Sequence, residues 1–142
     1  RPIARHLPYR LRRLLFRPLH ARLGGALELI ISAGAYLPPE LQQAWEDIGI
    51  IVLQGYGATE CGFAVANDEW HHPLGLVGRV HEGTEVRIDP ETGEIQVRGP
   101  TVMAGYLHDA EGTSRALQDG WLRTGDVGAL DSTGRLRMLD RV

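Results

Sequence analysis

The residues with the clearest chemical potential lie in one short segment, Gln-Gly-Tyr-Gly-Ala-Thr-Glu, which ends at Glu60. Tyr56 offers a flat ring, Thr59 a hydroxyl and Glu60 a carboxylate. Gly55 and Gly57 permit a close approach of the backbone. These groups suit a nucleotide with Mg²⁺, because Mg²⁺ in proteins takes one or two carboxylates together with phosphate oxygens. Taken alone, the same residues also fit a tight turn with a solvated glutamate.

Two strands and a helix are expected to position this segment. Leu27–Ile31 and Ile50–Leu53 are short apolar runs typical of buried strands, and Pro38 and Pro39 suit the first turn of a helix that runs to Ile48. This order predicts a parallel βαβ unit with a right-handed crossover, and ligands bind beyond the carboxyl ends of such strands. The helix is expected to pack through Leu41, Ala44, Trp45 and Ile48.

The chain after residue 74 has a different pattern, with short apolar runs separated by glycines. Turn residues lie between 86–88 and 95–97, and again between 127–130 and 136–139, so each pair of runs predicts a hairpin. Asp109 is placed to cap a short helix, and Trp121 is expected in the core. We predict an α/β chain, with the end of a parallel βαβ subdomain over 1–74 and a small antiparallel barrel-like or curled subdomain over 75–142.

The N-terminal residues predict a basic amphipathic helix, interrupted or split in two at Pro18. Such a helix can contact nucleic acid, an anionic membrane or a CoA phosphate, or it can be an arginine-coated surface helix that packs through its leucines. We favour the packed helix, expect no nucleic-acid partner, and keep peripheral membrane contact as a hypothesis. The leucines that form the stripe are Leu7, Leu11, Leu14, Leu15, Leu19 and Leu23.

Composition excludes several classes of protein. The 142 residues are 43% hydrophobic with a net charge of -3, which excludes a disordered chain. The apolar runs are far shorter than the roughly 20 residues of a membrane span. The single cysteine, Cys61, excludes an intramolecular disulfide framework and fits a cytoplasmic location. His71 and His72 lack a patterned third ligand, so we expect no metal site there.

All fifteen basic residues are arginine, and the chain contains no lysine. A lysine is a compact point charge that arginine does not simply replace. Any step that requires a lysine on a phosphate or carboxylate therefore needs a residue from outside this chain.

The segment ending at Glu60 resembles the YGxTE signature of the adenylate-forming superfamily, which includes acyl-CoA synthetases, nonribosomal-peptide adenylation domains and beetle luciferases. Further blocks resemble the same superfamily in its order along the chain. They are the small-residue loop at 32–37, the turn at 75–79, the GEIxVRGPxVMxGY block at 93–106, the DGWxxTGDxG block at 119–128 and the strand that leads to the interdomain hinge at 134–141.

The resemblance implies a role for each residue of the signature. Tyr56 would stack on adenine, Thr59 would hydrogen-bond a phosphate, and Glu60 would hold Mg²⁺. Thr59 and Glu60 would thus be the catalytic pair, while Gly55 and Gly57 would lie against the nucleotide.

The other blocks contribute nucleotide contacts by the same resemblance. Asp126 would accept hydrogen bonds from the ribose hydroxyls, and Arg141 would contact the ribose or a phosphate. Gly34, Ala35 and Tyr36 would form backbone walls beside the purine.

The implied activity is that of an AMP-forming acid–thiol ligase, which makes an acyl-adenylate from a carboxylic acid and ATP and then an acyl-CoA thioester. The residues over 10–25 and 33–41 look most like long-chain fatty-acid–CoA ligases. The expected cofactors and partners are ATP or AMP, Mg²⁺, CoA and a fatty acid; the oligomeric state is open. The superfamily's catalytic lysines cannot be in this chain, so we interpret it as part of the large N-terminal domain and expect it to be inactive alone. A peptide-type adenylation domain and a non-catalytic nucleotide-binding or structural module are the alternatives.

Overall fold

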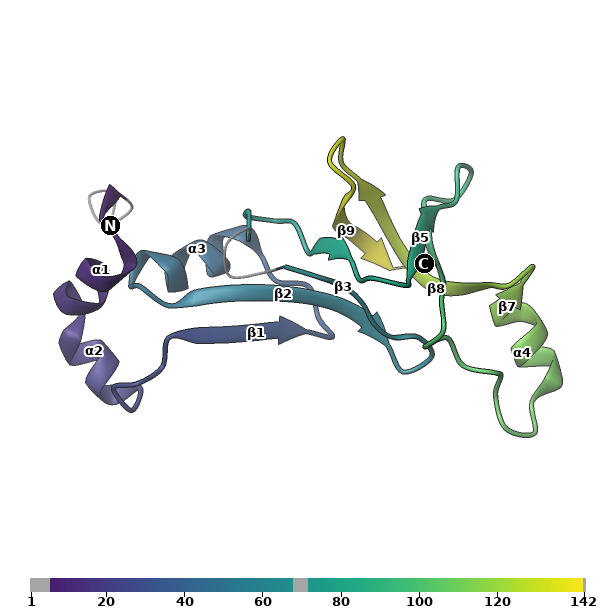
Figure 1. The fold of residues 1–142 in the computed structure, drawn as a ribbon, viewed down its shortest axis with the longest axis horizontal. Helices are drawn as coiled ribbons and strands as arrows, with labels where there is room; N and C mark the ends of the chain where they lie inside the picture. The colour runs from purple at the N-terminus through teal and green to yellow at the C-terminus, as the bar shows by residue number, and fades with distance from the viewer. Residues whose placement is uncertain (1–5, 68–71, 142) are drawn as a thin grey trace.

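The computed structural model describes residues 6–67 and 72–141 as a mixed α/β structure. The helices are α1 (Tyr9–Leu15), α2 (Arg17–Arg22), α3 (Pro39–Asp47) and α4 (Ala110–Ala116). The strands are β1 (Leu29–Ala33), β2 (Ile51–Ala58), β3 (Gly62–Ala66), β4 (Gly78–Val80), β5 (Glu85–Ile88), β6 (Glu94–Arg98), β7 (Leu117–Gln118), β8 (Trp121–Leu130) and β9 (Arg135–Arg141). Figure 1 shows an elongated molecule, with α1 and α2 at one end and α4 at the other.

A single sheet runs through the described chain in the order β1-β2-β3-β4-β9-β8-β6-β5, and β7 pairs with β8. The β1–β2 pair is parallel, whereas the other described pairs are antiparallel. The predicted α/β class and the antiparallel second half are confirmed. The path is open at β1 and β5, so the sheet is not a closed barrel, which leaves the curled sheet of the two predicted forms. The division at residue 74 stays a prediction, since β3 pairs with β4 across it.

The predicted βαβ unit is present, because β1 and β2 are parallel and α3 lies between them in the chain. The second strand is longer than predicted and continues through the signature as far as Ala58. Two glycines explain this extension. A Cβ on Gly57 would lie 2.0 Å from the Gly62 carbonyl oxygen, and one on Gly55 would lie 2.2 Å from the Phe63 ring. The absent side chains therefore allow β3 to pair along the signature, and only Thr59 and the residues after it form the turn.

Both predicted hairpins form in the second half. Val86 pairs with Val97 between β5 and β6, and Leu130 pairs with Leu136 between β8 and β9. Asp109 caps α4 as expected, accepting a hydrogen bond from the Gly112 amide at 2.7 Å. Trp121 is only partly buried, which corrects the expectation of a core position. Two guanidinium groups lie over its ring, that of Arg87 at 4.2 Å and that of Arg98 at 4.6 Å from the ring centroid.

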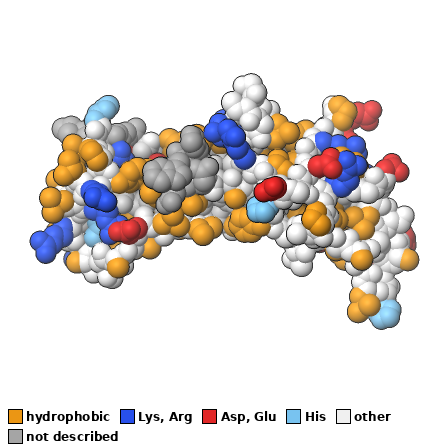
Figure 2. All heavy atoms as spheres, viewed as in Figure 1, with side chains coloured by type: hydrophobic (Ala, Val, Ile, Leu, Met, Phe, Trp, Pro, Cys, Tyr) orange, Lys and Arg blue, Asp and Glu red, His pale blue; other side chains and the backbone are white. Residues whose placement is uncertain are grey.

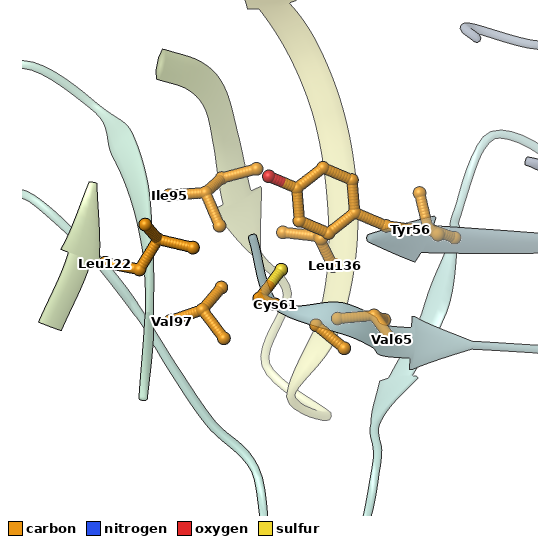
Figure 3. Packing of buried hydrophobic residues seen from close by; sticks show 9 residues of the cluster. Tyr56, Cys61, Val65, Ile95, Val97, Leu122 and Leu136 are labelled. Carbon is orange, nitrogen blue, oxygen red and sulfur yellow. The ribbon is translucent and has the colours of Figure 1, made fainter. Parts of the chain in front are cut away.

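The hydrophobic core lies between the middle strands of the sheet and the turn after β2. Figure 3 shows side chains from both halves of the chain in this cluster. Cys61 is fully buried and has a free thiol, as the sequence predicted for a small structural cysteine. The buried members are Tyr56, Cys61, Ala64, Val65, Val77, Ile95, Val97, Leu122 and Leu136.

Contrary to our expectation, the two N-terminal helices do not pack through their leucines, and several of these leucines are exposed. The segment does form two short helices, but they meet at Phe16, and Pro18 lies in the first turn of α2 and not at the break. The side chains of Leu14 and Leu15 are 66% and 60% exposed. Two arginines point inward instead: Arg12 donates to the Glu46 carbonyl at 2.7 Å and Arg13 to the Leu27 carbonyl at 2.6 Å. Figure 2 shows hydrophobic side chains at the surface of this end of the molecule.

Helix α3 also buries the face that its sequence pattern assigned to solvent. Leu41 is 48% exposed, whereas Gln42 and Glu46 are 0% and 7% exposed. Gln42 accepts a hydrogen bond from Gln54 of β2 at 2.9 Å and donates to Glu46 at 3.0 Å, and His72 Nδ1 lies 3.0 Å from the same Glu46 oxygen. A polar network therefore holds α3 against the sheet.

Within the described residues, no helix is both long enough and apolar enough to span a bilayer.

Candidate functional site

The turn between β2 and β3 carries the two residues predicted to be catalytic. Thr59 is exposed and Glu60 is partly exposed. The turn is closed by the Cys61 amide, which donates to the Ala58 carbonyl at 3.1 Å. Gly62 then starts β3 with φ of 62°, a left-handed conformation that suits glycine. The chain reversal that presents the hydroxyl and the carboxylate thus follows from the glycines on either side of it.

Glu60 is hydrogen-bonded to a segment that lies more than forty residues further along the chain. Its Oε1 accepts a hydrogen bond from the Tyr106 hydroxyl at 2.9 Å, and its carbonyl accepts one from the Met103 amide at 2.7 Å. The carbonyl of Cys61 accepts a third from the Thr101 hydroxyl at 2.7 Å. Both the backbone and the carboxylate of the predicted Mg²⁺ ligand are therefore held by residues 101–106.

Tyr56 and Asp126 meet although 70 residues separate them. The Tyr56 hydroxyl donates to Asp126 Oδ2 at 2.9 Å. Burial raises the pKa of Tyr56 well above its ordinary value, a hydrogen bond with Thr124 opposes the change, and the Asp126 carboxylate raises the pKa further. The phenol is therefore protonated and acts as a donor at neutral pH.

The Tyr56 ring packs in the core and is only 7% exposed. Figure 3 shows the ring beside Leu136, with its hydroxyl directed toward Ile95. Stacking on a purine uses an open ring face, so the expected adenine stacking stays a prediction.

The remaining predicted residues lie on elements next to this pair. The backbone of Arg141 on β9 is opposite Asp126 on β8, but its side chain lies outside the described part of the structure, so its predicted contact is not visible. Gly34, Ala35 and Tyr36 form an exposed loop directly after β1.

The parallel register brings that loop to the signature. Ala33, the last residue of β1, is paired with Gly55 in β2. The small-residue loop after Ala33 and the stretch from Gly55 to Gly57 consequently share one edge of the sheet, as expected for a crevice beyond parallel strands.

Burial and the carboxylates of Glu60 and Asp126 all affect the pKa of the Cys61 thiol. Burial raises this pKa, a hydrogen bond with the Ala58 backbone opposes the increase, and the carboxylates of Glu60 and Asp126 both raise it further. Both carboxylates therefore lie within coulombic reach of one buried thiol, which also argues against a nucleophilic role for Cys61.

The donor set of the site suits a magnesium nucleotide better than a metal bound by protein alone. The described residues contain no group of three or more His, Cys, Asp or Glu side chains able to hold a metal ion. One partly exposed carboxylate beside a hydroxyl matches the binding of Mg²⁺ through one or two carboxylates and phosphate oxygens. Of the two histidines for which we expected no metal site, His71 lies outside the described residues, as do the neighbouring Asp68 and Glu69.

Comparison with known proteins decides the family. The family described as AMP-binding enzyme matches residues 5–107 of the chain. The chain belongs to the AMP-binding enzyme family. This confirms the resemblance found from the signature and the blocks that follow it.

Proteins similar to this chain include long-chain-fatty-acid–CoA ligases. One is FadD15 of Mycobacterium bovis, 37% identical over 130 residues, which are 91% of this chain and 22% of that protein. Another is long chain acyl-CoA synthetase 1 of Arabidopsis thaliana, 35% identical over 90% of this chain and 22% of that protein. The chain thus spans less than a quarter of the length of these relatives.

Solved structures of AMP-binding enzymes share the fold. ATP-bound MatB from Rhodopseudomonas palustris is 34% identical, with a TM-score of 0.75 over 80% of this chain and 25% of that one. O-succinylbenzoate coenzyme A synthetase from Bacillus subtilis, in complex with ATP and magnesium ion, is 31% identical, with a TM-score of 0.72 over 87% of this chain and 30% of that one.

One residue of the site has no role predicted from the sequence. Tyr106 lies in the GEIxVRGPxVMxGY block, and that block was informative only as a family marker. A signal was present, because a tyrosine after Gly105 in an otherwise apolar run carries a hydroxyl that needs a partner. The sequence does not show that the partner is Glu60, since 46 residues separate the two.

Proposed function

We propose that the chain forms part of the nucleotide-binding surface of an ATP-dependent carboxylic acid–CoA ligase that acts on fatty acids. The observation that carries the proposal is the convergence of signature residues with residues of the distant blocks: Glu60 with Tyr106, and Tyr56 with Asp126. The long-chain-fatty-acid–CoA ligases among its relatives support the substrate class. Because the chain covers only 22% of these proteins, the complete reaction is proposed for a longer protein.

Each polar residue has a role that its chemistry fits. Glu60 presents a partly exposed carboxylate suited to Mg²⁺, and Thr59 presents an exposed hydroxyl suited to a phosphate oxygen. The ionised Asp126 carboxylate would offer only acceptor oxygens, which suits the two hydroxyl donors of a ribose. Arg141 follows on β9, where a guanidinium fork suits a phosphate or ribose oxygen.

The purine is proposed to lie against the backbone of the loop that follows β1. Gly34, Ala35 and Tyr36 are exposed at the edge of the sheet next to Gly55. The Tyr56 ring is 7% exposed, so stacking on adenine would require it to rotate out of the core.

Mg²⁺, when bound, would neutralise charge on the ATP phosphates. The chain's own residues orient the nucleotide, but the chain contains no lysine to stabilise charge that develops during transfer. CoA and the fatty acid require surfaces that these residues do not define. We therefore expect nucleotide binding, and no ligase activity, from the chain alone.

Nucleotide binding by this chain is the first test. Calorimetry with ATP and Mg²⁺ should detect binding that is weakened by Asp126→Asn and by Glu60→Gln, whereas Glu82→Gln, at an exposed position outside the site, should leave it unchanged. Equal affinities for all four proteins would contradict the assigned roles.

A chimaera tests the reaction. The matching 130 residues of FadD15 would be replaced by those of this chain, and ATP–pyrophosphate exchange measured with acids from acetate to palmitate and with amino acids. Exchange with long acids supports the proposal, and exchange with amino acids favours the peptide-type alternative. A folded chimaera that binds ATP without exchange favours a non-catalytic module.

Peripheral membrane contact and a cytoplasmic location remain proposals. Arg10, Arg17 and Arg22 are exposed near Leu14 and Leu15, a combination that suits an anionic lipid surface. Co-sedimentation with anionic liposomes should fall when these three arginines are changed to glutamate, and unchanged binding would exclude this contact. The location rests on one free cysteine and is testable by fractionating cells that produce the protein.

A further inference from the structure

The Glu60 carboxylate is the end point of a chain of hydrogen bonds that begins in α4. Asp109 caps the helix by accepting from the Gly112 amide at 2.7 Å. The hydroxyl of Thr113, in the first turn, donates to the Asp109 carbonyl at 2.7 Å and accepts from the Tyr106 amide at 2.8 Å. The Tyr106 hydroxyl then donates to Glu60 Oε1 at 2.9 Å.

The loop before α4 is built for this arrangement. Gly105 has φ of 150°, and a Cβ there would lie 2.7 Å from the Thr113 methyl group. Only glycine allows the backbone before Tyr106 to pass this close to the helix. The position of the phenol is consequently fixed by the backbone on one side and by Glu60 on the other.

The hydrogen bond leaves the two carboxylate oxygens of Glu60 unequal. Among the described residues, Oε1 has the tyrosine as its side-chain partner, and no side-chain partner is found for Oε2. A donor on Oε1 restricts rotation of the carboxylate and leaves Oε2 as the oxygen available to a cation.

We propose that Tyr106 is a positioning residue that orients Glu60 for binding the magnesium of a metal–nucleotide complex. This inference rests on the proposed function, because it needs Glu60 to be the metal ligand. Tyr106 itself contacts the carboxylate and neither the metal nor the nucleotide. Its effect should therefore be transmitted entirely through Glu60.

Tyr106→Phe tests the proposal because it keeps the ring and removes only the hydroxyl. Tyr9→Phe is a matched control, since the Tyr9 hydroxyl lies 3.4 Å from the carboxylate of another glutamate, Glu46, outside the site. Binding of Mn²⁺–ATP by the 142-residue chain, followed by electron paramagnetic resonance, gives the metal dissociation constant of each protein. We expect Tyr106→Phe to raise it about threefold to tenfold, as for loss of one hydrogen bond, and Tyr9→Phe to leave it unchanged.

A double-mutant cycle separates positioning from general damage to the fold. In a Glu60→Gln background, Tyr106→Phe should change the metal dissociation constant no further. The proposal would be overturned if Tyr106→Phe changed the metal dissociation constant by the same factor with Glu60 and with Glu60→Gln. It would also be overturned if Tyr106→Phe and Tyr9→Phe bound the metal with equal affinity. Absence of Mn²⁺–ATP binding by the unmodified chain would contradict the proposed function as well, so the two failures are distinguishable.

Discussion

The two ends of the sheet are stabilised in different ways. Around β6, β8 and β9 a cluster of apolar side chains is buried, with Ile95 and Leu136 at 0% exposure. At the end formed by α1, α2, α3 and β1, Leu14 and Ile31 are each 66% exposed, while Gln42 is fully buried in a hydrogen-bond network. Hydrophobic burial therefore dominates in the first region, whereas in the second region directional polar contacts act beside the buried side chains of Ile50 and Val52.

Leucine truncation should give the largest difference between the two regions. Leu136→Ala removes a fully buried side chain and should lower the free energy of unfolding by about 2–5 kcal/mol, because it leaves a cavity. Leu14→Ala is the same chemical change at a 66% exposed site and should stay within about 0.5 kcal/mol. Urea unfolding measures both, and similar losses would show that Leu14 is buried in solution.

The polar network should show the next largest effect. Gln54→Leu removes the donor that lies 2.9 Å from the Gln42 side-chain oxygen and leaves that buried acceptor unpaired. The expected cost is about 1–3 kcal/mol. Gln118→Leu makes the same change at an exposed position and should cost little. If Gln54→Leu were neutral, hydrophobic packing would have to hold α3 as well.

These contrasts explain which parts of the fold are predictable. In the hairpins, alternation and turn chemistry agree, and the pairing of Val86 with Val97 follows from the sequence. In α3, the 3.6-residue period correctly predicts a helix. It does not predict that Gln42 is hydrogen-bonded to Gln54 of β2, or that Glu46 contacts His72. The spacing of apolar residues predicts which face of a helix is hydrophobic. It does not predict hydrogen bonds to residues that are distant in the sequence.

The same limit applies to the candidate site. The residue types of Glu60 and Asp126 follow from the signature and the later blocks. Their partners do not, because Tyr106 and Tyr56 reach them across 46 and 70 residues. The predicted second strand is also too short. Glycines in a motif suggest a loop, but here Gly57 permits close pairing between two strands.

The contact between the halves should contribute a smaller amount. Tyr56→Phe removes a hydrogen bond of 2.9 Å to Asp126 and keeps the ring in the core. We expect a loss of about 0.5–1.5 kcal/mol, and no loss for Tyr36→Phe, whose ring is 67% exposed. Thermal unfolding of both variants checks this. A neutral Tyr56→Phe would mean that the core and the other contacts between the halves, such as the Tyr106–Glu60 hydrogen bond, hold them together without this one.

Acid sensitivity should be the smallest effect, and it should come from the hairpin region. Hydrogen bonds from the Arg135 amide and the Thr133 hydroxyl lower the pKa of Asp131, which closes the β8–β9 turn. Because the folded-state pKa lies below that of the unfolded chain, the ionised carboxylate stabilises the fold above the unfolded-state pKa. This contribution is lost as the pH falls through the lowered folded-state value.

Asp131→Asn keeps an acceptor oxygen but cannot titrate, so its unfolding free energy should depend less steeply on pH in that acidic window. Ser132→Ala changes the same turn, keeps the carboxylate and should retain the slope of the unmodified chain. The difference between Asp131→Asn and the unmodified chain should shrink toward low pH, where both carry a neutral side chain. If the difference were constant across the window, Asp131 would stabilise the turn by geometry alone, and the acid response would have to arise elsewhere in the sheet.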